Sequence, residues 1–186
     1  MQLQSIDLAV AAEELGADGV CFRMYYFACQ LSSLFPLLAA VGARTSKIEI
    51  GTGFIDMLRY ENPLYMAEDA GAADLISNGR LQLGISRSSP EQVVEGYCYF
   101  GYVPQEGEID ADIGRRHTEA FLEVLRGEGF AKLNPQLMLP NPPRLRRLEP
   151  FPEGLREPHL VGLRLQRHGG VGGENGYEPA KLDTER

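Results

Sequence analysis

The chain has 186 residues, of which 44% are hydrophobic and 24% are charged, and its formal net charge is -8. These values are typical of a globular domain, whereas a nucleic-acid partner requires a basic surface that this acidic chain lacks. No apolar stretch approaches the ~20 residues that span a bilayer, and the first residues lack the basic start of a signal peptide. The sequence therefore predicts a cytoplasmic protein with no nucleic-acid and no membrane partner.

The chain contains three cysteines, Cys21, Cys29 and Cys98. An odd number does not suit a disulfide framework, and no two of them have the C-x-x-C spacing of a metal or redox site. We therefore expect reduced thiols in or near the core, and no metal site.

Residues 3–15 are predicted to form the first helix. Its apolar stripe has members at i, i+3, i+4 and i+7: Leu8, Ala11, Ala12 and Leu15. Gly16 follows as a C-terminal stop. The β-rich run "DGVCFR" comes next, followed by a helix at "FPLLAAVGA" with Pro36 near its first turn, and by a strand at "KIEIGTG".

Asn62 and Pro63 mark the start of a third helix, because the Asn side chain caps free N–H groups and Pro fits where no N–H is needed. Asn78 and Gly79 end this helix after about Ile76, and "RLQLGI" is predicted to be a third strand.

A longer helix is expected from Asp110 to Arg126, with Gly127 beyond its end. Its inner side is predicted to carry five residues: Ile113, His117, Phe121, Val124 and Leu125. At this spacing a core or interface role for His117 is favoured over catalysis.

The predicted strands begin near Val20, Ile48 and Leu81, which is about one βα unit of roughly 30 residues apart. Each strand is followed by a helix that returns the chain for a parallel neighbour, so the fold class is α/β. Such units build either a closed (β/α)8 barrel or an open doubly wound sheet. Neither of the first two βα turns carries a G-x-G-x-x-G, which disfavours a dinucleotide-binding fold.

Residues 62–89, "NPLYMAEDAGAADLISNGRLQLGISRSS", resemble the luciferase-like monooxygenase family of flavin-dependent enzymes. In that family a helix rich in Ala, Glu and Asp precedes a Ser-x-Gly-Arg turn and a strand that closes in Gly-x-x-Arg. The segments "LFPLLAAVGARTSKIEIGTG" and "RRHTEAFLEVLRGEGF" are similar to the same family in the same order. The resemblance implies a partial (β/α)8 barrel of the luciferase-like type, with its chemistry at the carboxyl ends of the strands.

The resemblance implies a flavin site at these strand ends. Arg87 corresponds to an arginine that binds the flavin phosphate, which a guanidinium with paired donors suits, and Ser88 is adjacent to it. Thr52, Gly53 and Phe54 are expected along the isoalloxazine ring, where small residues let the backbone approach a flat ligand. An ordinary loop arginine and a plain strand-ending glycine are the alternatives.

The chain departs from the family after its first strand. Where the family commonly has a His-His pair, one member of which acts as a proton donor or base, this chain has Tyr25 and Tyr26. A tyrosine, with a pKa near ~10, donates a hydrogen bond at neutral pH and seldom acts as a base. The two tyrosines are therefore candidate catalytic donors, and aromatic lining of a pocket is the favoured alternative.

The resemblance implies an enzyme in which reduced FMN activates O₂ to oxygenate a small organic substrate, with a flavin reductase and a homodimer as expected partners. A deazaflavin (F420)-dependent oxidoreductase on the same barrel is the first alternative. A decayed, non-catalytic fragment is the second.

Residues 1–157 are expected to form one partial barrel domain, because a complete barrel needs ~250 residues and the family's first strand precedes the helix at 3–15. Residues 158–186 are rich in glycine and have no helical or strand period. Read one base later with suitable codons, they yield "IWWGCGSNATAVWAA", which is similar to the family's continuation. We therefore interpret this tail as out of frame, with a genuine flexible terminus as the alternative.

Overall fold

The structure is a computed structural model that describes residues 2–23, 25–29, 31, 33–53, 59–85, 93–127, 129–134, 145–149 and 155. Three of the predicted cofactor-binding residues, Phe54, Arg87 and Ser88, lie outside the described residues. The predicted domain boundary at 157 and the tail after it also lie outside them.

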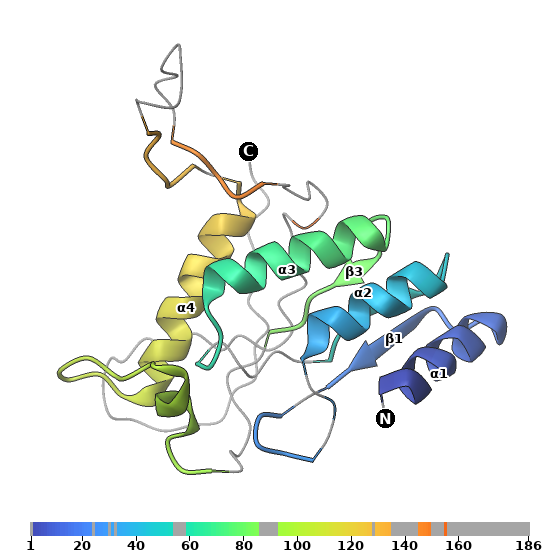
Figure 1. Cartoon of the computed structure of the whole chain (residues 1–186), viewed down its shortest axis with the longest axis horizontal. Coiled ribbons are helices and arrows are strands. Elements are labelled where there is room, and N and C mark those ends of the chain that lie inside the picture. Colours follow the sequence, from blue (N-terminus) through green and yellow to red (C-terminus); the bar gives the residue numbers. More distant parts are fainter. Residues whose placement is uncertain are drawn as a thin grey trace, which may run out of the picture.

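Three helix–strand pairs follow one another, and a 3-10 helix and a further α-helix come after them (Figure 1). The elements are α1 (Gln2–Glu14), β1 (Gly19–Phe22), α2 (Leu34–Arg44), β2 (Glu49–Thr52), α3 (Pro63–Ile76), β3 (Leu81–Gln82), the 3-10 helix η1 (Gly96–Phe100) and α4 (Asp110–Leu125). All four predicted helices and all three predicted strands are therefore confirmed.

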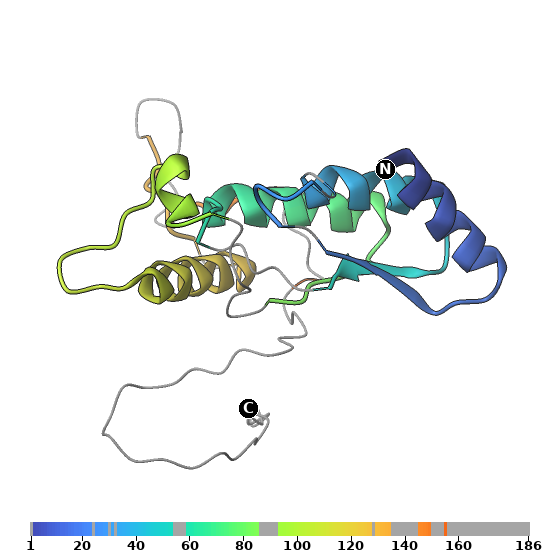
Figure 2. The ribbon, with the colours of Figure 1, turned by 90° about the horizontal axis from the view of Figure 1, so that it is seen from below.

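The strands form one parallel sheet in the order β1-β2-β3. Phe22 pairs with Thr52 across the first ladder, and Ile50 pairs with Leu81 across the second. Helices α1, α2 and α3 lie over the same face of this sheet (Figure 2). The parallel arrangement confirms the predicted α/β class, because βα units with right-handed crossovers place consecutive strands side by side.

The ends of α3 are fixed by the residues that the sequence indicated. The Asn62 side chain accepts hydrogen bonds from the backbone N–H groups of Leu64, at 2.9 Å, and Tyr65, at 3.3 Å. At the other end Asn78 and Gly79 both adopt the left-handed conformation, with φ of 57° and 78°. Two successive left-handed residues reverse the chain and aim it into β3.

The core lies between the sheet and the helices. Its fully buried side chains include Leu37, Leu38, Ile48, Ile50, Leu83, Ile85, Ile113 and Phe121. The predicted inner side of α4 is confirmed, since all five of its residues are buried. Among them, His117 packs edge-on against the ring of Tyr102 at 4.6 Å, which agrees with a core role.

The predicted stripe of the first helix is wrong. Leu8 is 67% exposed and Leu15 is 88% exposed, whereas Ala9 is completely buried. Helix α1 contacts α2 and β1 through the side that carries Ile6, Ala9 and Ala12. Of the four predicted residues, Ala12 alone lies on the packed side, while Leu8, Ala11 and Leu15 are exposed.

The three cysteines form no disulfide, in agreement with the prediction, but all three are exposed rather than in the core. None of the described helices is long and apolar enough to cross a membrane.

Candidate functional site

The carboxyl ends of the strands are joined into one edge by hydrogen bonds. The Gly53 N–H donates to the Phe22 carbonyl at 2.8 Å. The buried Thr52 hydroxyl donates to the Gly84 carbonyl at 3.0 Å and accepts from the Gly84 N–H at 2.8 Å. Thr52 therefore connects the ends of the second and third strands, and its hydroxyl is fully engaged by the backbone.

Two glycines make this close packing of the strands feasible. A Cβ at Gly51 would lie 2.4 Å from the Gln82 carbonyl oxygen, and one at Gly84 would lie 2.8 Å from the Gly53 oxygen. Gly53 differs, because a Cβ there would make only ordinary contacts, the nearest at 3.5 Å to the Phe22 oxygen. Gly53 is also half-buried, so its surroundings leave space beside the backbone.

The loop after β1 carries Tyr25 and Tyr26, both half-buried. The Arg23 guanidinium lies over the Tyr25 ring, 4.7 Å from its centroid, in cation–π geometry. The Tyr26 hydroxyl donates a hydrogen bond to a carboxylate oxygen of Glu61, which directly precedes the Asn62 cap of α3. The structure thus separates the two tyrosines: one meets a cation and the other a carboxylate.

The environment of the Tyr26–Glu61 pair favours the protonated form of both groups. Burial raises the pKa of Glu61, and the negative charge of Asp69 adds to this, while the hydrogen bond from Tyr26 opposes it. Burial and the neighbouring Glu61 raise the pKa of Tyr26 above its usual value. Tyr26 therefore holds its proton at any physiological pH and acts as a hydrogen-bond donor, not as a base.

Tyr26 belongs to a group of six rings in mutual contact, which we call the aromatic cluster. The cluster consists of Tyr26, Phe27, Tyr60, Tyr97, Tyr99 and Phe100. The Tyr26 ring lies 4.9 Å from Tyr60 and 4.8 Å from Phe100, measured between centroids. Phe100 lies edge-on to Tyr60 at 5.4 Å. The cluster joins the loop after β1, the residues before α3 and the 3-10 helix η1.

The opposite edge of the sheet is held by Arg80, at the end of the predicted Ser-x-Gly-Arg turn. Its Nε donates to the Ser77 carbonyl at 2.7 Å. Its Nη1 donates to the Thr45 hydroxyl and the Ile48 carbonyl, and its Nη2 to the carbonyls of Gly42 and Thr45, all within 2.8–2.9 Å. The five donors of one guanidinium thus join the ends of α2 and α3 to the start of β2.

Glu13 holds the same edge from α1. Its carboxylate accepts from the backbone N–H groups of Ser46, Lys47 and Ile48, at 2.7–3.0 Å. These backbone donors lower the pKa of Glu13 to about 2. Arg80 and Glu13 therefore stabilise the amino ends of the strands, because their polar atoms are bonded to neighbouring helix ends and to the segment before β2.

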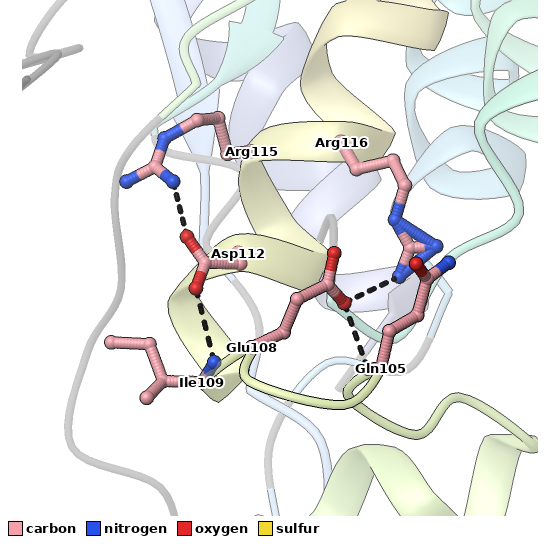
Figure 3. A network of polar contacts seen from close by, with 6 residues as sticks. All are labelled: Gln105, Glu108, Ile109, Asp112, Arg115 and Arg116. Carbon is pink, nitrogen blue, oxygen red and sulfur yellow. Dashed lines mark hydrogen bonds and ion pairs between the residues drawn. The ribbon is translucent and has the colours of Figure 1, made fainter.

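Helix α4 has a polar network at its amino end (Figure 3). Asp112 accepts from the Ile109 N–H at 3.0 Å and pairs with Arg115, while Glu108 accepts from the Gln105 N–H at 2.8 Å and pairs with Arg116 at 3.4 Å. Acidic groups at the start of a helix stabilise it, because they interact favourably with the positive end of the helix dipole. Buried Arg59 pairs with Asp110 and so connects the segment before α3 to α4.

The sequence pattern of the luciferase-like monooxygenase family matches residues 4–127, which include every helix and strand described above except the first two residues of α1. The chain belongs to this family. None of the curated protein sequences compared with the chain matches it.

Solved structures of luciferase-like proteins have a similar fold. The monooxygenase RslO1 from Streptomyces bottropensis is 22% identical, with a TM-score of 0.65 over 87% of this chain and 46% of that one. The oxygenating constituent of 3,6-diketocamphane monooxygenase from Pseudomonas putida, solved with FMN, is 21% identical, with a TM-score of 0.58 over 72% and 36%. Coenzyme F420-dependent tetrahydromethanopterin reductase from Methanopyrus kandleri is 18% identical, with a TM-score of 0.52 over 79% and 43%.

The chain spans less than half the length of these three structures. Three parallel strands in consecutive order also occur in one half of a doubly wound sheet, so the strand order alone does not decide the architecture. The fold similarity decides it in favour of part of a (β/α)8 barrel of the luciferase-like type.

Four of the seven predicted site residues lie in the described part of the chain, at or beside the same edge of the sheet. Thr52 and Gly53 lie at the carboxyl edge of the sheet, and Tyr25 and Tyr26 lie in the loop after the neighbouring strand. Glu61, which accepts the hydrogen bond of the candidate residue Tyr26, was not among the residues that the sequence indicated. The available signal was its position directly before the Asn-Pro helix start, at the same end of the βα units as Tyr26.

Proposed function

We propose that the chain is the flavin-binding part of a monooxygenase that uses reduced FMN and O₂ to oxygenate a small organic substrate. The observation that carries this proposal is the carboxyl edge of the sheet, where Thr52 and Gly84 align the strand ends and Gly53 has space beside it. In barrels of this type catalysis takes place at that edge. The FMN bound in the similar 3,6-diketocamphane monooxygenase constituent supports the choice of cofactor.

The residues at this edge fit a flat ligand. Gly53 and the following Phe54 lie along the isoalloxazine ring in this proposal, and Thr52 fixes the backbone beside them because its hydroxyl is engaged by Gly84. Arg87 and Ser88 bind the flavin phosphate. When bound, reduced FMN supplies the electrons that activate O₂.

Tyr25 and Tyr26 border the substrate side of this site in the proposal. Tyr26 donates its proton in a hydrogen bond to Glu61 and remains protonated, so it orients a neighbouring group and does not abstract a proton from it. The pair thus places a fixed phenol, whose oxygen can still accept a hydrogen bond, where the family commonly has histidine.

F420 is the second candidate cofactor, because one similar structure is an F420-dependent reductase. With F420 the site would transfer hydride without O₂. We also propose that the protein is cytoplasmic, since its three cysteines are free thiols, and that it works as a homodimer supplied by a flavin reductase.

The test is a fluorescence titration of the full chain with FMN and, separately, with F420. Tighter binding of FMN supports the monooxygenase, tighter binding of F420 supports the alternative, and binding of neither overturns both. Arg87→Ala should weaken the binding of FMN about ten- to hundredfold, because a charge-assisted phosphate contact is lost.

A matched pair of glycine variants tests whether the isoalloxazine ring of FMN lies beside Gly53. Gly53→Ala should weaken FMN binding without loss of stability, because its Cβ meets only ordinary contacts at 3.5 Å in the protein but fills the space beside the backbone. Gly19→Ala, at the amino end of β1 and so at the opposite edge of the sheet, with contacts at 3.6 Å, should change neither quantity. Equal FMN affinity in the two variants would remove Gly53 from the site.

A further inference from the structure

The hydrogen bond between Tyr26 and Glu61 can run in either direction. In the structure the Tyr26 hydroxyl donates to a carboxylate oxygen of Glu61. This direction uses the single proton of the phenol, so the hydroxyl donates to no other group while Glu61 is ionised. A protonated Glu61 is itself a donor and can give its hydrogen to the phenol oxygen instead. The ionisation of Glu61 therefore decides whether the Tyr26 proton is available to another acceptor.

The groups that face Glu61 favour its protonated form. In the described part of the chain the groups that interact with it electrostatically or by a hydrogen bond are Tyr26, Asp69 and Tyr102. Two of these are neutral phenols and the third is a carboxylate. Burial and the charge of Asp69 raise the pKa of Glu61, while the hydrogen bond from Tyr26 lowers it. Glu61 therefore takes up a proton at a higher pH than an exposed glutamate does.

The segment that carries Glu61 is held in place. Arg59 pairs with Asp110 of α4, and the guanidinium is thereby directed at α4. The next residue, Tyr60, is buried, and its ring lies 4.9 Å from that of Tyr26 between centroids. The carboxyl group and the phenol therefore stay together in both protonation states. The hydrogen bond can reverse by rotation of O–H groups alone, without movement of the heavier atoms.

We infer that Glu61 is a positioning residue that directs and replenishes the proton of Tyr26. Protonated Glu61 donates to the phenol oxygen, and the Tyr26 hydroxyl then donates to an oxygen atom at the carboxyl edge that becomes negatively charged in the reaction. The inference rests on the proposed function, because reduced FMN supplies the electrons that give this oxygen its charge.

The proton transfer that follows is balanced within the pair. When the charged oxygen takes the Tyr26 proton, the O–H bond of the phenol breaks and the Glu61 proton moves to the phenol oxygen. Tyr26 is then again a neutral phenol, and Glu61 is left as a carboxylate. Because Glu61 is only half-buried, water can return a proton to it. Tyr26 thus acts as a general acid without ever becoming a phenolate.

The test follows the Tyr26 phenol in the full chain by NMR, with tyrosine labelled with ¹³C at Cζ, whose chemical shift responds to hydrogen bonding of the hydroxyl. Tyr26→Phe identifies the signal by its loss. We expect the signal to shift in one step between about pH 4 and about pH 9, the range in which a buried carboxyl group titrates. Glu61→Gln should abolish the step, because an amide does not titrate. A signal that is constant with pH, or that shifts equally in Glu61→Gln, would overturn the inference.

Asp69→Asn and Glu68→Gln are the matched variants, because both residues are exposed neighbours on α3 and the charge of Asp69, not that of Glu68, acts on Glu61. Asp69→Asn should move the midpoint of the Tyr26 step to lower pH, since a neighbouring negative charge is removed. Glu68→Gln should leave the midpoint unchanged. The same midpoint in both variants would overturn Glu61 as the group that controls the phenol.

Oxygen uptake from reduced FMN keeps the inference separate from the proposed function. After subtraction of the rate without protein, the rate should fall about tenfold or more as the pH rises through the midpoint of the NMR step, because a general acid is lost. Glu61→Gln should be slow at every pH, since the amide passes on no proton. Uptake that is independent of Glu61 contradicts the inference and leaves the flavin proposal standing. An NMR step without FMN binding or oxygen uptake contradicts the monooxygenase and supports the control of Tyr26 by Glu61.

Discussion

The two edges of the sheet are built on opposite principles. At the amino edge, Arg80 and Glu13 are bonded mainly to backbone groups, and all five donors of the Arg80 guanidinium are used. At the carboxyl edge, Thr52 aligns two strands, and beyond it lie exposed rings and the Tyr26–Glu61 pair. Barrel enzymes in general keep stability at the first edge and chemistry at the second. In this chain the stabilising half of that division is visible in the hydrogen bonds of the amino edge, and the proposed site occupies the other edge.

Arg80→Ala should have the largest effect on stability. It removes five hydrogen bonds and leaves the carbonyls of Gly42, Ile48 and Ser77 without this donor. We expect a loss of about 3 kcal/mol or more in the free energy of unfolding, measured by urea titration.

The control for this variant is Arg147→Ala, which breaks an exposed ion pair with Glu149 and should cost less than about 1 kcal/mol. Equal losses in the two variants would show that the amino edge is not the stabilising one.

Thr52→Val should have the next largest effect, a loss of about 2 kcal/mol in the free energy of unfolding. The change keeps the shape of the side chain but leaves the N–H and C=O of Gly84 without their partner in a buried site. Thr52→Ser, which keeps the hydroxyl, should cost less than about 1 kcal/mol. If Val is tolerated as well as Ser, the carboxyl edge does not depend on this connection.

The elements that the sequence predicted correctly have local causes. Asn62 caps its own helix within three residues, and Asn78 with Gly79 ends it by left-handed geometry. The parallel order follows from chain connectivity once the strands and helices are recognised. These features need no knowledge of distant contacts, so a single sequence suffices for them.

The features that were missed depend on distant partners. The face of α1 that packs is chosen by α2 and β1, and periodicity does not show which face a neighbour will cover. Glu61 meets Tyr26 across 35 positions of the chain, and Glu13 meets Ile48 across the same separation. A carboxylate on a loop or a helix end has the same local sequence signature whether it faces solvent or a phenol.

Glu13→Gln tests the amino edge through its pH dependence. The pKa of Glu13 is about 2 in the folded chain and 4.5 ordinarily, so the folded chain binds fewer protons than the unfolded chain between these values. The stabilisation is complete above pH 4.5 and is lost as the pH falls toward 2. The variant should be less stable at neutral pH and should lose less stability over this acidic range. If plots of unfolding free energy against pH are parallel for the native chain and the variant, Glu13 does not cause the loss of stability in acid.

Tyr26→Phe should have the smallest effect on the free energy of unfolding, under about 1 kcal/mol. It tests the carboxyl edge, where the pH dependence of stability runs opposite to that of Glu13. Burial holds the pKa of Glu61 above its ordinary 4.5 in the folded chain, and the Tyr26 hydroxyl moderates this shift. The fold therefore loses stability as the pH rises from 4.5 through the raised value, and removal of the hydroxyl increases that loss. The gap in unfolding free energy between the native chain and the variant should be wider at about pH 8 than at about pH 4.

Tyr99→Phe is the control for this variant, because the Tyr99 side chain is 80% exposed, and the loss of its hydroxyl should leave the unfolding free energy unchanged at both pH values. A gap that stays constant with pH would mean that Tyr26 does not act on the ionisation of Glu61, and the donor role proposed for this tyrosine would fall with it.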